Sequence, residues 1–229
     1  MNIKVIAFDA DDTLWVNEPY FRETEEKFCQ LMEDYMPRNS IDKELFKTEI
    51  QNLSLYGYGI KGFTLSMIET ALRVSDKTVS IDVIEQAIAY GKDLLGRPIE
   101  LIDGIESVLE ALKDQYRLVV ATKGDLLDQE RKLRKSGLLH YFHHIEVMSD
   151  KQEADYQKLL RHLDIPAQQF MMVGNSLKSD ILPVLNLGGH AIHIPFHTTW
   201  AHEQIEHNVE HPNFRQEVGV ADILRYLVA

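Results

Sequence analysis

Short apolar runs alternate with helical segments along this chain, and this alternation limits the possible folds more than any other feature. After residue 98 the apolar runs occupy residues 117–122, 144–148, 170–173 and 191–194. A further run covers residues 3–8. Runs of this kind are typical of strands buried in a parallel sheet, and the segments between them have helical spacing. The pattern therefore predicts an α/β fold in which helices flank a parallel sheet.

One long segment interrupts the alternation. Residues 16–97 show helical patterns only, and Ser80 can cap a helix that ends at Gly96. Because the run at residues 3–8 belongs with the strands after residue 98, this segment is inserted into a single α/β domain. We predict a core formed by residues 1–15 and 98–229, and an all-helical domain formed by residues 16–97.

Composition and charge argue against several classes of partner. The chain has 229 residues, of which 45% are hydrophobic, and a formal net charge of -12. Phosphate groups repel such a protein, so nucleic acid and anionic membrane surfaces are unfavourable partners, whereas a small anionic substrate can still enter a cleft of local positive charge. No apolar run has the length of a membrane span, and no signal-peptide pattern is present. Cys29 is the single cysteine, so we expect a cytoplasmic protein without disulfides. The oligomeric state stays open, because the sequence shows no exposed apolar stripe that would mark a subunit interface.

Polar side chains follow four of the predicted strands. They are Asp9 and Asp11 after the first strand, Thr122 and Lys123 at the end of the second, Lys151 after the third, and Asn175 and Asp180 after the fourth. In parallel sheets, ligands bind beyond the carboxyl ends of the strands. We therefore expect these side chains to meet at one edge of the sheet.

A phosphomonoester at this edge would meet the groups that its hydrolysis needs. Asp9 is the natural nucleophile, because a carboxylate can attack phosphorus and form an acyl phosphate that water then hydrolyses. Asp11 can protonate the leaving oxygen and then activate the water. Thr122 can donate a hydrogen bond to a phosphoryl oxygen, and Lys151 supplies a positive charge. Lys123 is either a second contact to the phosphate or a surface charge.

The same edge has the oxygen chemistry that Mg²⁺ prefers. Burying the carboxylates of Asp9 and Asp11 costs several kcal/mol each unless a cation compensates them. Asn175 offers an amide oxygen to the metal, and Asp180 can hold a metal-bound water. We predict that these four residues form a magnesium site.

These motifs carry a resemblance to a known family. The stretch Asp9-Ala10-Asp11-Asp12-Thr13 resembles the DxDxT motif of the haloacid dehalogenase-like hydrolases. Thr122 and Lys151 stand where that family has its second and third motifs, and residues 174–180 resemble the fourth, GDxxxxD. The resemblance covers roughly the full chain. It implies a Rossmann-like core, a helical cap between the first two motifs, Mg²⁺ and an aspartyl-phosphate intermediate. It also implies that the main-chain carbonyl of Asp11, rather than its carboxylate, binds the metal.

One position departs from the family pattern. The first acid of the fourth motif is Asn175 here, so the site loses one negative charge, and we expect weaker metal binding rather than its loss. An inactive ligand-binding or regulatory descendant is the alternative from a different class. Metal-independent dehalogenation of a 2-haloacid is a rival reaction. The resemblance implies that dehalogenases of this family typically have no acid at the position of Asp11, so the presence of Asp11 favours phosphoryl transfer. A phosphomutase would use the same aspartyl phosphate.

Substrate contacts from the inserted domain are expected in its glycine-containing stretch. Residues 55–63 include three glycines, which predict a loop. Tyr58 and Lys61 in this stretch can contact a hydroxylated or anionic leaving group, or the stretch is a plain helix connector. The expected substrate is a small phosphorylated metabolite, whose identity depends on the shape of the closed cap.

Overall fold

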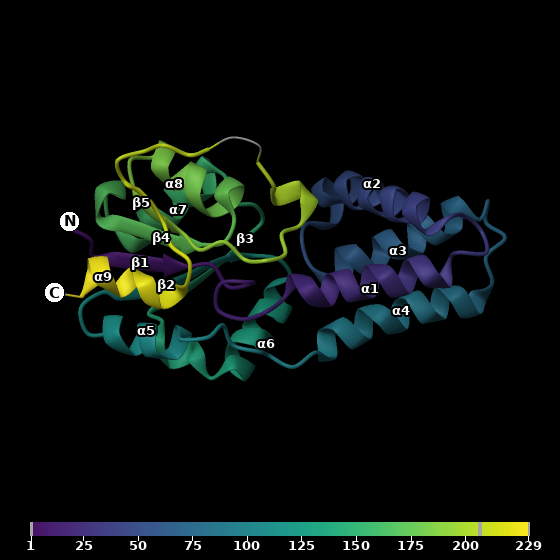
Figure 1. The fold of residues 1–229 in the computed structure, drawn as a ribbon, viewed down its shortest axis with the longest axis horizontal. Coiled ribbons are helices and arrows are strands. Elements are labelled where there is room, and N and C mark those ends of the chain that lie inside the picture. Colours follow the sequence, from purple (N-terminus) through teal and green to yellow (C-terminus); the bar gives the residue numbers. More distant parts are fainter. Residues whose placement is uncertain (1, 206–207, 229) are drawn as a thin grey trace. The chain divides into compact units, whose positions relative to one another are not determined.

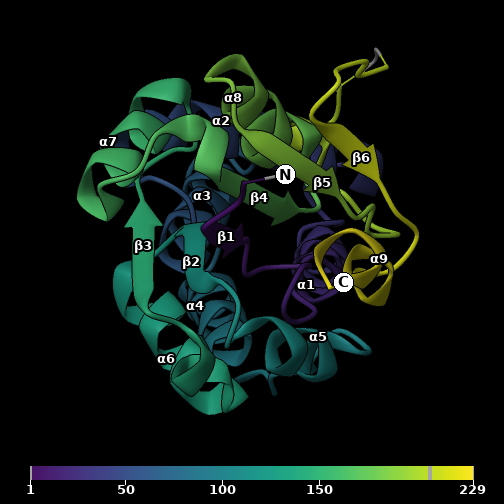
Figure 2. The ribbon, with the colours of Figure 1, turned by 90° about the vertical axis from the view of Figure 1, so that its left-hand side faces the viewer.

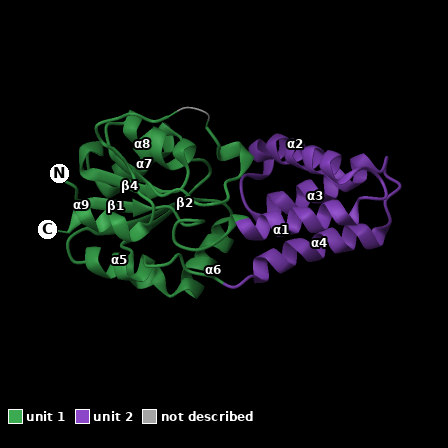
Figure 3. Ribbon diagram, in the orientation of Figure 1, with its two compact units in different colours: residues 1–18, 99–229 green, residues 19–98 purple. Residues whose placement is uncertain are grey.

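The computed structural model of the protein describes residues 2–205 and 208–228. The chain divides into two compact units (Figure 3). Unit 1 combines residues 1–18 with residues 99–229, and unit 2 comprises residues 19–98. Each unit is described by itself below.

Unit 1 is built on one parallel sheet. Its strands are β1 (Val5–Phe8), β2 (Arg117–Lys123), β3 (His144–Met148), β4 (Phe170–Gly174), β5 (His190–His193) and β6 (Phe214–Gln216). Their spatial order is β3-β2-β1-β4-β5-β6, and every neighbouring pair is parallel (Figure 2). This sheet confirms the predicted α/β class. The short, mostly exposed strand β6 was not predicted, because its few residues carry no apolar run.

Helices cover both faces of the sheet (Figure 1). Alternate residues of β1 separate the two cores: Ile6 and Phe8 point to one, and Val5 and Ala7 to the other. This is the period of two that a strand imposes. The first core includes α5 (Ile105–Leu112), α6 (Leu126–Ser136) and α9 (Leu224–Leu227), and the second includes α7 (Glu153–Leu163) and α8 (Leu182–Asn186). Burial on both faces explains why the strands read as continuous apolar runs.

Unit 2 contains only helices among its described elements. They are α1 (Glu18–Leu31), α2 (Arg38–Tyr56), α3 (Ile60–Val74) and α4 (Ile81–Gly96). Phe28, Ile41 and Met67 are fully buried in their shared core. Ser80 accepts a hydrogen bond from the Val83 main-chain nitrogen at 3.4 Å, which confirms the predicted helix start.

The predicted loop over residues 55–63 is wrong in its extent. Helix α2 continues to Tyr56 and α3 begins at Ile60, so only Gly57, Tyr58 and Gly59 connect them. Gly57 and Gly59 have φ angles of 72° and 115°, which end one helix and reset the chain for the next. Gly62 lies inside α3, where a side chain would come within 2.9 Å of the Gly57 oxygen. Close packing across the turn, rather than a longer loop, accounts for the third glycine.

The described helices include none with the combined length and hydropathy of a membrane span. Cys29 is buried in the core of unit 2, where it packs as a small apolar side chain.

Candidate active site

The site lies where the strand order reverses. From β1 the chain moves outward through β2 and β3, and then returns to β4 on the other side of β1. Strand β1 runs in register with both neighbours, so that Phe8 pairs with Val120 and with Val173. Asp9 extends this pairing by donating its main-chain N–H to the Val173 oxygen at 2.9 Å. Such a switch point is where open α/β sheets bind their ligands.

A buried lysine joins two of the predicted carboxylates. Lys151 Nζ lies 2.5 Å from Asp9 Oδ1 and 2.6 Å from Asp180 Oδ1. All three side chains are nearly inaccessible to solvent. The structure therefore brings the first, third and fourth predicted motifs into direct contact, although residues 9 and 180 are far apart in the sequence.

Burial and charge act in opposite directions on this triad. Burial raises the pKa of the Asp9 carboxyl to about 7, against the attraction of Lys151. Burial also disfavours the charged form of Lys151, but Asp180 and Asp9 outweigh it and raise the pKa of the lysine. The lysine is therefore a fixed positive charge. A further cation beside Asp9 would favour its ionised, nucleophilic form.

The carboxylate of Asp180 is tightly enclosed. Its Oδ2 atom accepts the main-chain N–H of Ser176 at 2.9 Å, while Oδ1 binds Lys151. A side chain at Gly174 would come within 2.3 Å of Asp180 Oδ2, so only glycine leaves room for the carboxylate at this position. The buried hydroxyl of Tyr156 donates to the Ser179 oxygen at 3.0 Å and supports the same turn from α7.

A set of oxygen atoms converges beside Asp9. The side-chain amide atom of Asn175 that faces β1 lies 3.2 Å from Asp9 Oδ2, 3.2 Å from the main-chain oxygen of Asp11 and 3.2 Å from Thr13 Oγ1. When the amide oxygen occupies this position, it can accept a hydrogen bond only from Thr13. It then faces two other acceptors without a proton between them, the Asp9 carboxylate oxygen and the Asp11 main-chain oxygen. Neighbouring ligands of an octahedral Mg²⁺ with bonds of about 2.1 Å lie about 3.0 Å apart. The spacing of these oxygens therefore fits a magnesium ion. An amide nitrogen in the same position would instead lie within hydrogen-bond distance of all three atoms.

The three oxygens that could bind a metal carry little negative charge. Asp9 contributes its single carboxylate, and the other two oxygens are neutral. Within residues 2–205 and 208–228, no group of three or more His, Cys, Asp or Glu side chains is arranged to hold a metal. Mg²⁺ accepts carbonyl and amide oxygens together with carboxylates, so the residues present fit the ion although they form no acidic cluster.

The main-chain oxygen and the side-chain carboxylate of Asp11 face different partners. Its main-chain oxygen faces Asn175, whereas its carboxylate points to other partners. Oδ1 accepts Trp15 Nε1 at 2.7 Å and Lys132 Nζ at 2.8 Å, and Oδ2 accepts Gln129 Nε2 at 3.0 Å. Three hydrogen bonds thus hold the carboxylate away from the oxygens around Asn175.

Asp12 has a structural position beside the site. It has a φ of 62°, and its carboxylate accepts the main-chain N–H groups of Asn17 and Glu18 at 2.8 Å and 3.0 Å. It therefore satisfies orphan donors at the start of α1. Burial raises the pKa of its carboxyl to about 7.

Lys123 is engaged by an acid that we did not predict. Its Nζ lies 2.5 Å from Glu203 Oε1 and 3.0 Å from Ser179 Oγ. The other Glu203 oxygen accepts the hydroxyls of Ser176 and Ser179 at 2.5 Å and 2.6 Å. Burial raises the pKa of Glu203, but Lys123 and the two hydroxyls overcome this and lower it to about 2. Lys123 therefore contacts the fourth motif, and its role as a phosphate ligand stays a prediction.

Three further predicted contacts are Thr122, Tyr58 and Lys61. Thr122 is buried at the end of β2, where its hydroxyl accepts Gln129 Nε2 at 2.9 Å. Tyr58 and Lys61 belong to unit 2, in the α2–α3 connection and the first turn of α3.

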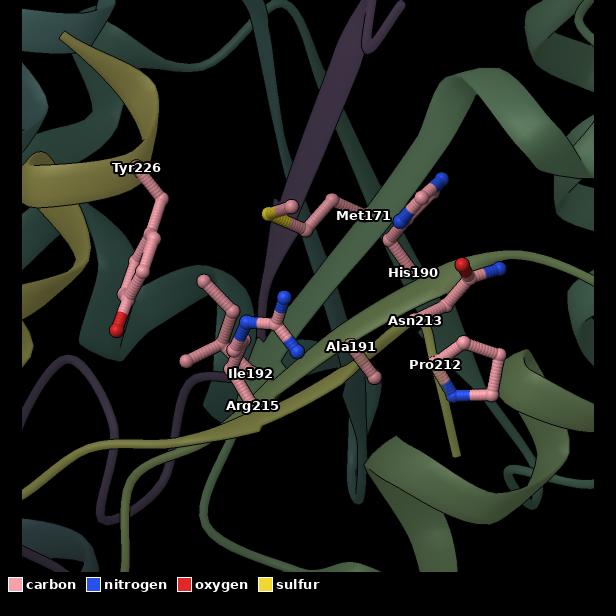
Figure 4. A pocket seen from close by; sticks show the side chains of 8 residues that line it. All are labelled: Met171, His190, Ala191, Ile192, Pro212, Asn213, Arg215 and Tyr226. Atoms are coloured by element: carbon pink, nitrogen blue, oxygen red, sulfur yellow. The ribbon is translucent and has the colours of Figure 1, made fainter. Parts of the chain in front are cut away.

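A separate cavity of about 120 Å³ lies at the opposite ends of the strands. Met171 and His190 lie near the starts of β4 and β5, and Arg215 and Tyr226 complete part of the lining (Figure 4). None of its lining residues is an acid, and none belongs to the predicted motifs. It plays no part in the site at the carboxyl ends.

Known proteins match most of this chain. A family profile described as haloacid dehalogenase-like hydrolase matches residues 3–188. The chain belongs to this family. The haloacid dehalogenase-like hydrolase of known structure from Xanthomonas campestris is 36% identical, with a TM-score of 0.89 over 99% of this chain and 92% of the other. The predicted family and Rossmann-like fold are thereby confirmed.

Two curated relatives have a named activity. The glyceraldehyde 3-phosphate phosphatase of Pyrococcus abyssi is 29% identical over 81% of this chain and 79% of its own length. That of Methanothermobacter thermautotrophicus is 28% identical over 83% and 84%. Both similarities extend over most of this chain and most of each relative.

Sequence reasoning missed the residues that support the motifs. Gln129 and Lys132, which bind the Asp11 carboxylate, lie on α6, and Glu203 lies in a short turn far along the chain. The three-residue spacing of Gln129 and Lys132 places them on one helix face, which was the only available signal. Nothing in the sequence around Glu203 marks it, because its partners come from β2 and the fourth motif.

Proposed function

We propose that this hydrolase is a magnesium-dependent phosphatase of small phosphorylated metabolites. The observation that carries the proposal is the contact of Lys151 with both Asp9 and Asp180, beside the oxygens around Asn175. The proposal is supported because a carboxylate, a positive charge and a set of oxygens that suits a cation lie together at the carboxyl ends of the strands. The names of the two curated relatives make a triose phosphate the first substrate to examine.

Each residue has a distinct role in this proposal. Asp9 attacks phosphorus and forms an aspartyl phosphate. Asp11 gives a proton to the leaving oxygen, and then takes one from the water that hydrolyses the intermediate. Lys151 offsets negative charge on the phosphoryl group, and the Thr122 hydroxyl donates to one of its oxygens.

The metal would be held by the Asp9 carboxylate, the Asp11 main-chain oxygen and the Asn175 amide oxygen, with Asp180 acting through a bound water. When bound, Mg²⁺ supplies positive charge that stabilises the charge developing on the phosphoryl oxygens. Among the chain's own groups, Lys151 fixes the direction of Asp9. The Asp9 carboxylate would thereby face the incoming phosphorus in one orientation.

Unit 2 would act as the cap of this enzyme. Its position in the sequence, inserted between the first and second motifs, supports this role. Tyr58 and Lys61 would then contact the leaving group, because binding residues concentrate in connections carried by rigid helices.

We expect pure protein to hydrolyse an aryl phosphate and glyceraldehyde 3-phosphate only when Mg²⁺ is present. Release of inorganic phosphate is measured with excess Mg²⁺, with a chelator, and after the metal is restored. A panel of sugar phosphates, nucleotides and phosphoglycolate gives the preferred substrate as the highest kcat/KM. Halide release from a 2-haloacid in the presence of chelator, without phosphate release from any ester, would refute the proposal in favour of dehalogenation.

Restoring the family's acid at Asn175 is expected to tighten metal binding. Asn175→Asp adds a charge within 3.2 Å of the oxygens of Asp9 and Asp11, so the activation constant for Mg²⁺ falls by about tenfold, which equals about 1.4 kcal/mol. Phosphate release at varied Mg²⁺ measures it. In chelator the variant unfolds at lower temperature than the wild type, because two carboxylates face each other. An unchanged activation constant would show that Asn175 does not contact the metal.

A further inference from the structure

The carboxylate of Asp11 is held by donors from two separate segments. Trp15 and Lys132 both donate to Oδ1, at 2.7 Å and 2.8 Å, and Gln129 donates to Oδ2 at 3.0 Å. All four residues belong to unit 1. Three converging donors leave the carboxylate one orientation, whereas an exposed aspartate samples several rotamers.

Lys132 is itself fixed in place. Its Nζ also contacts Asn17 Oδ1 at 2.8 Å and lies 3.8 Å from Asp128 Oδ2. The exposed fractions of the Lys132 and Asp11 side chains are 13% and 26%. An ion pair at this depth is less screened than one on the surface, so Lys132 restrains Asp11 more strongly than an exposed lysine does.

Gln129 connects Asp11 with the second motif. Its exposed fraction is 4%, and its Nε2 lies 2.9 Å from Thr122 Oγ1 and 3.0 Å from the Lys123 main-chain oxygen, in addition to its contact with Asp11. Its Oε1 is buried without a hydrogen-bond partner among the described residues. Through its amide nitrogen, Gln129 ties the first motif to the second.

We propose that Gln129 and Lys132 are positioning residues that hold the Asp11 carboxylate in one orientation for proton transfer. Both of its oxygens are restrained, Oδ1 by Trp15 and Lys132 and Oδ2 by Gln129. The proposal rests on the phosphatase function given above. As Asp9 bonds to phosphorus and the ester P–O bond breaks, a proton passes from the Asp11 carboxyl to the leaving oxygen. In the second step, the Asp11 carboxylate takes a proton from water as the new P–O bond forms and the Asp9–phosphorus bond breaks.

The two positioning residues are tested by the dependence of the rate on the leaving group. A poor leaving group, such as an alkoxide, needs the proton more than an aryloxide does. The value of kcat/KM covers the steps up to leaving-group release, so it is measured for glycerol phosphate and for 4-nitrophenyl phosphate. In Lys132→Met and in Gln129→Leu, the ratio of the alkyl to the aryl value falls by about tenfold or more. Lys132→Arg restores part of the ratio.

The matched control is Lys135→Met. Lys135 lies on the same helix and is exposed, so its removal leaves the ratio unchanged. Equal losses for both substrates in Lys132→Met would show a merely structural role, and unchanged values in both positioning variants would refute the proposal. A wild-type enzyme that hydrolyses neither ester in excess Mg²⁺ would instead refute the phosphatase function.

A second measurement tests the contact without activity. The melting temperatures of Lys132→Met, Asp11→Asn and the double variant form a double-mutant cycle. If Lys132 holds Asp11, the double variant melts well above the temperature that the summed losses predict. Additive losses would overturn the proposal whatever the enzyme hydrolyses.

Discussion

Asp9→Asn is expected to lower kcat for every phosphate ester by more than about a thousandfold, because it removes the attacking oxygen. The amide has nearly the same shape as the carboxylate. Lys151 keeps its 2.6 Å contact with Asp180, so the variant should fold. Burial already raises the pKa of Asp9 to about 7, which indicates that the fold tolerates a neutral group there. Phosphate release under single-turnover conditions, with circular dichroism as a check on folding, measures the effect.

Two further variants separate charge from geometry at this position. Asp9→Glu keeps the charge but moves the carboxylate along by one methylene, so attack on phosphorus loses its alignment and activity is again lost. Asp103→Asn makes the same acid-to-amide change at an exposed residue of unit 1 and leaves kcat unchanged. Activity of Asp9→Asn within tenfold of the wild type would assign the nucleophile elsewhere.

The strands and the residues at their ends were predictable because both depend on local patterns. Burial on both faces produces continuous apolar runs, and a parallel sheet forces the carboxyl ends of its strands to one edge. From these two facts the contact of Asp9, Lys151 and Asp180 follows, although their separations in sequence are large. The fold class could be obtained in the same way.

The supporting contacts could not be predicted, because they depend on how side chains of separate elements meet. Lys132 faces Asp11 only because α6 packs on the sheet through Leu133. Glu203 reaches Lys123 from a short turn without periodic pattern. The extent of the glycine-containing connection was also wrong, because glycine composition does not distinguish a long loop from a tight turn followed by closely packed helix. Register and packing decide such contacts, and neither is local.

Removing the buried lysine tests the electrostatics of the whole site. In Lys151→Met the carboxylates of Asp9 and Asp180 lose their shared cation, and breaking a buried ion pair in this way costs about 3–5 kcal/mol. We expect the metal-free variant to lose stability by about this amount in urea unfolding. Lys158→Met, an exposed lysine on α7, should leave stability unchanged. A loss below about 1 kcal/mol would show that the lysine does not compensate the two acids.

The loss of stability in Lys151→Met is expected to depend on pH and on Mg²⁺. Asp9 binds its proton more tightly in the folded protein, with a pKa raised from 3.8 to about 7, so its contribution to stability falls as the pH rises through this interval. Without Lys151 the pKa of Asp9 rises further, because a cation that favoured ionisation is gone. The variant therefore loses more stability relative to the wild type at pH 8 than at pH 5. Added Mg²⁺ restores part of the loss at pH 8, since a cation again faces Asp9, whereas a loss independent of both pH and Mg²⁺ would reflect packing alone.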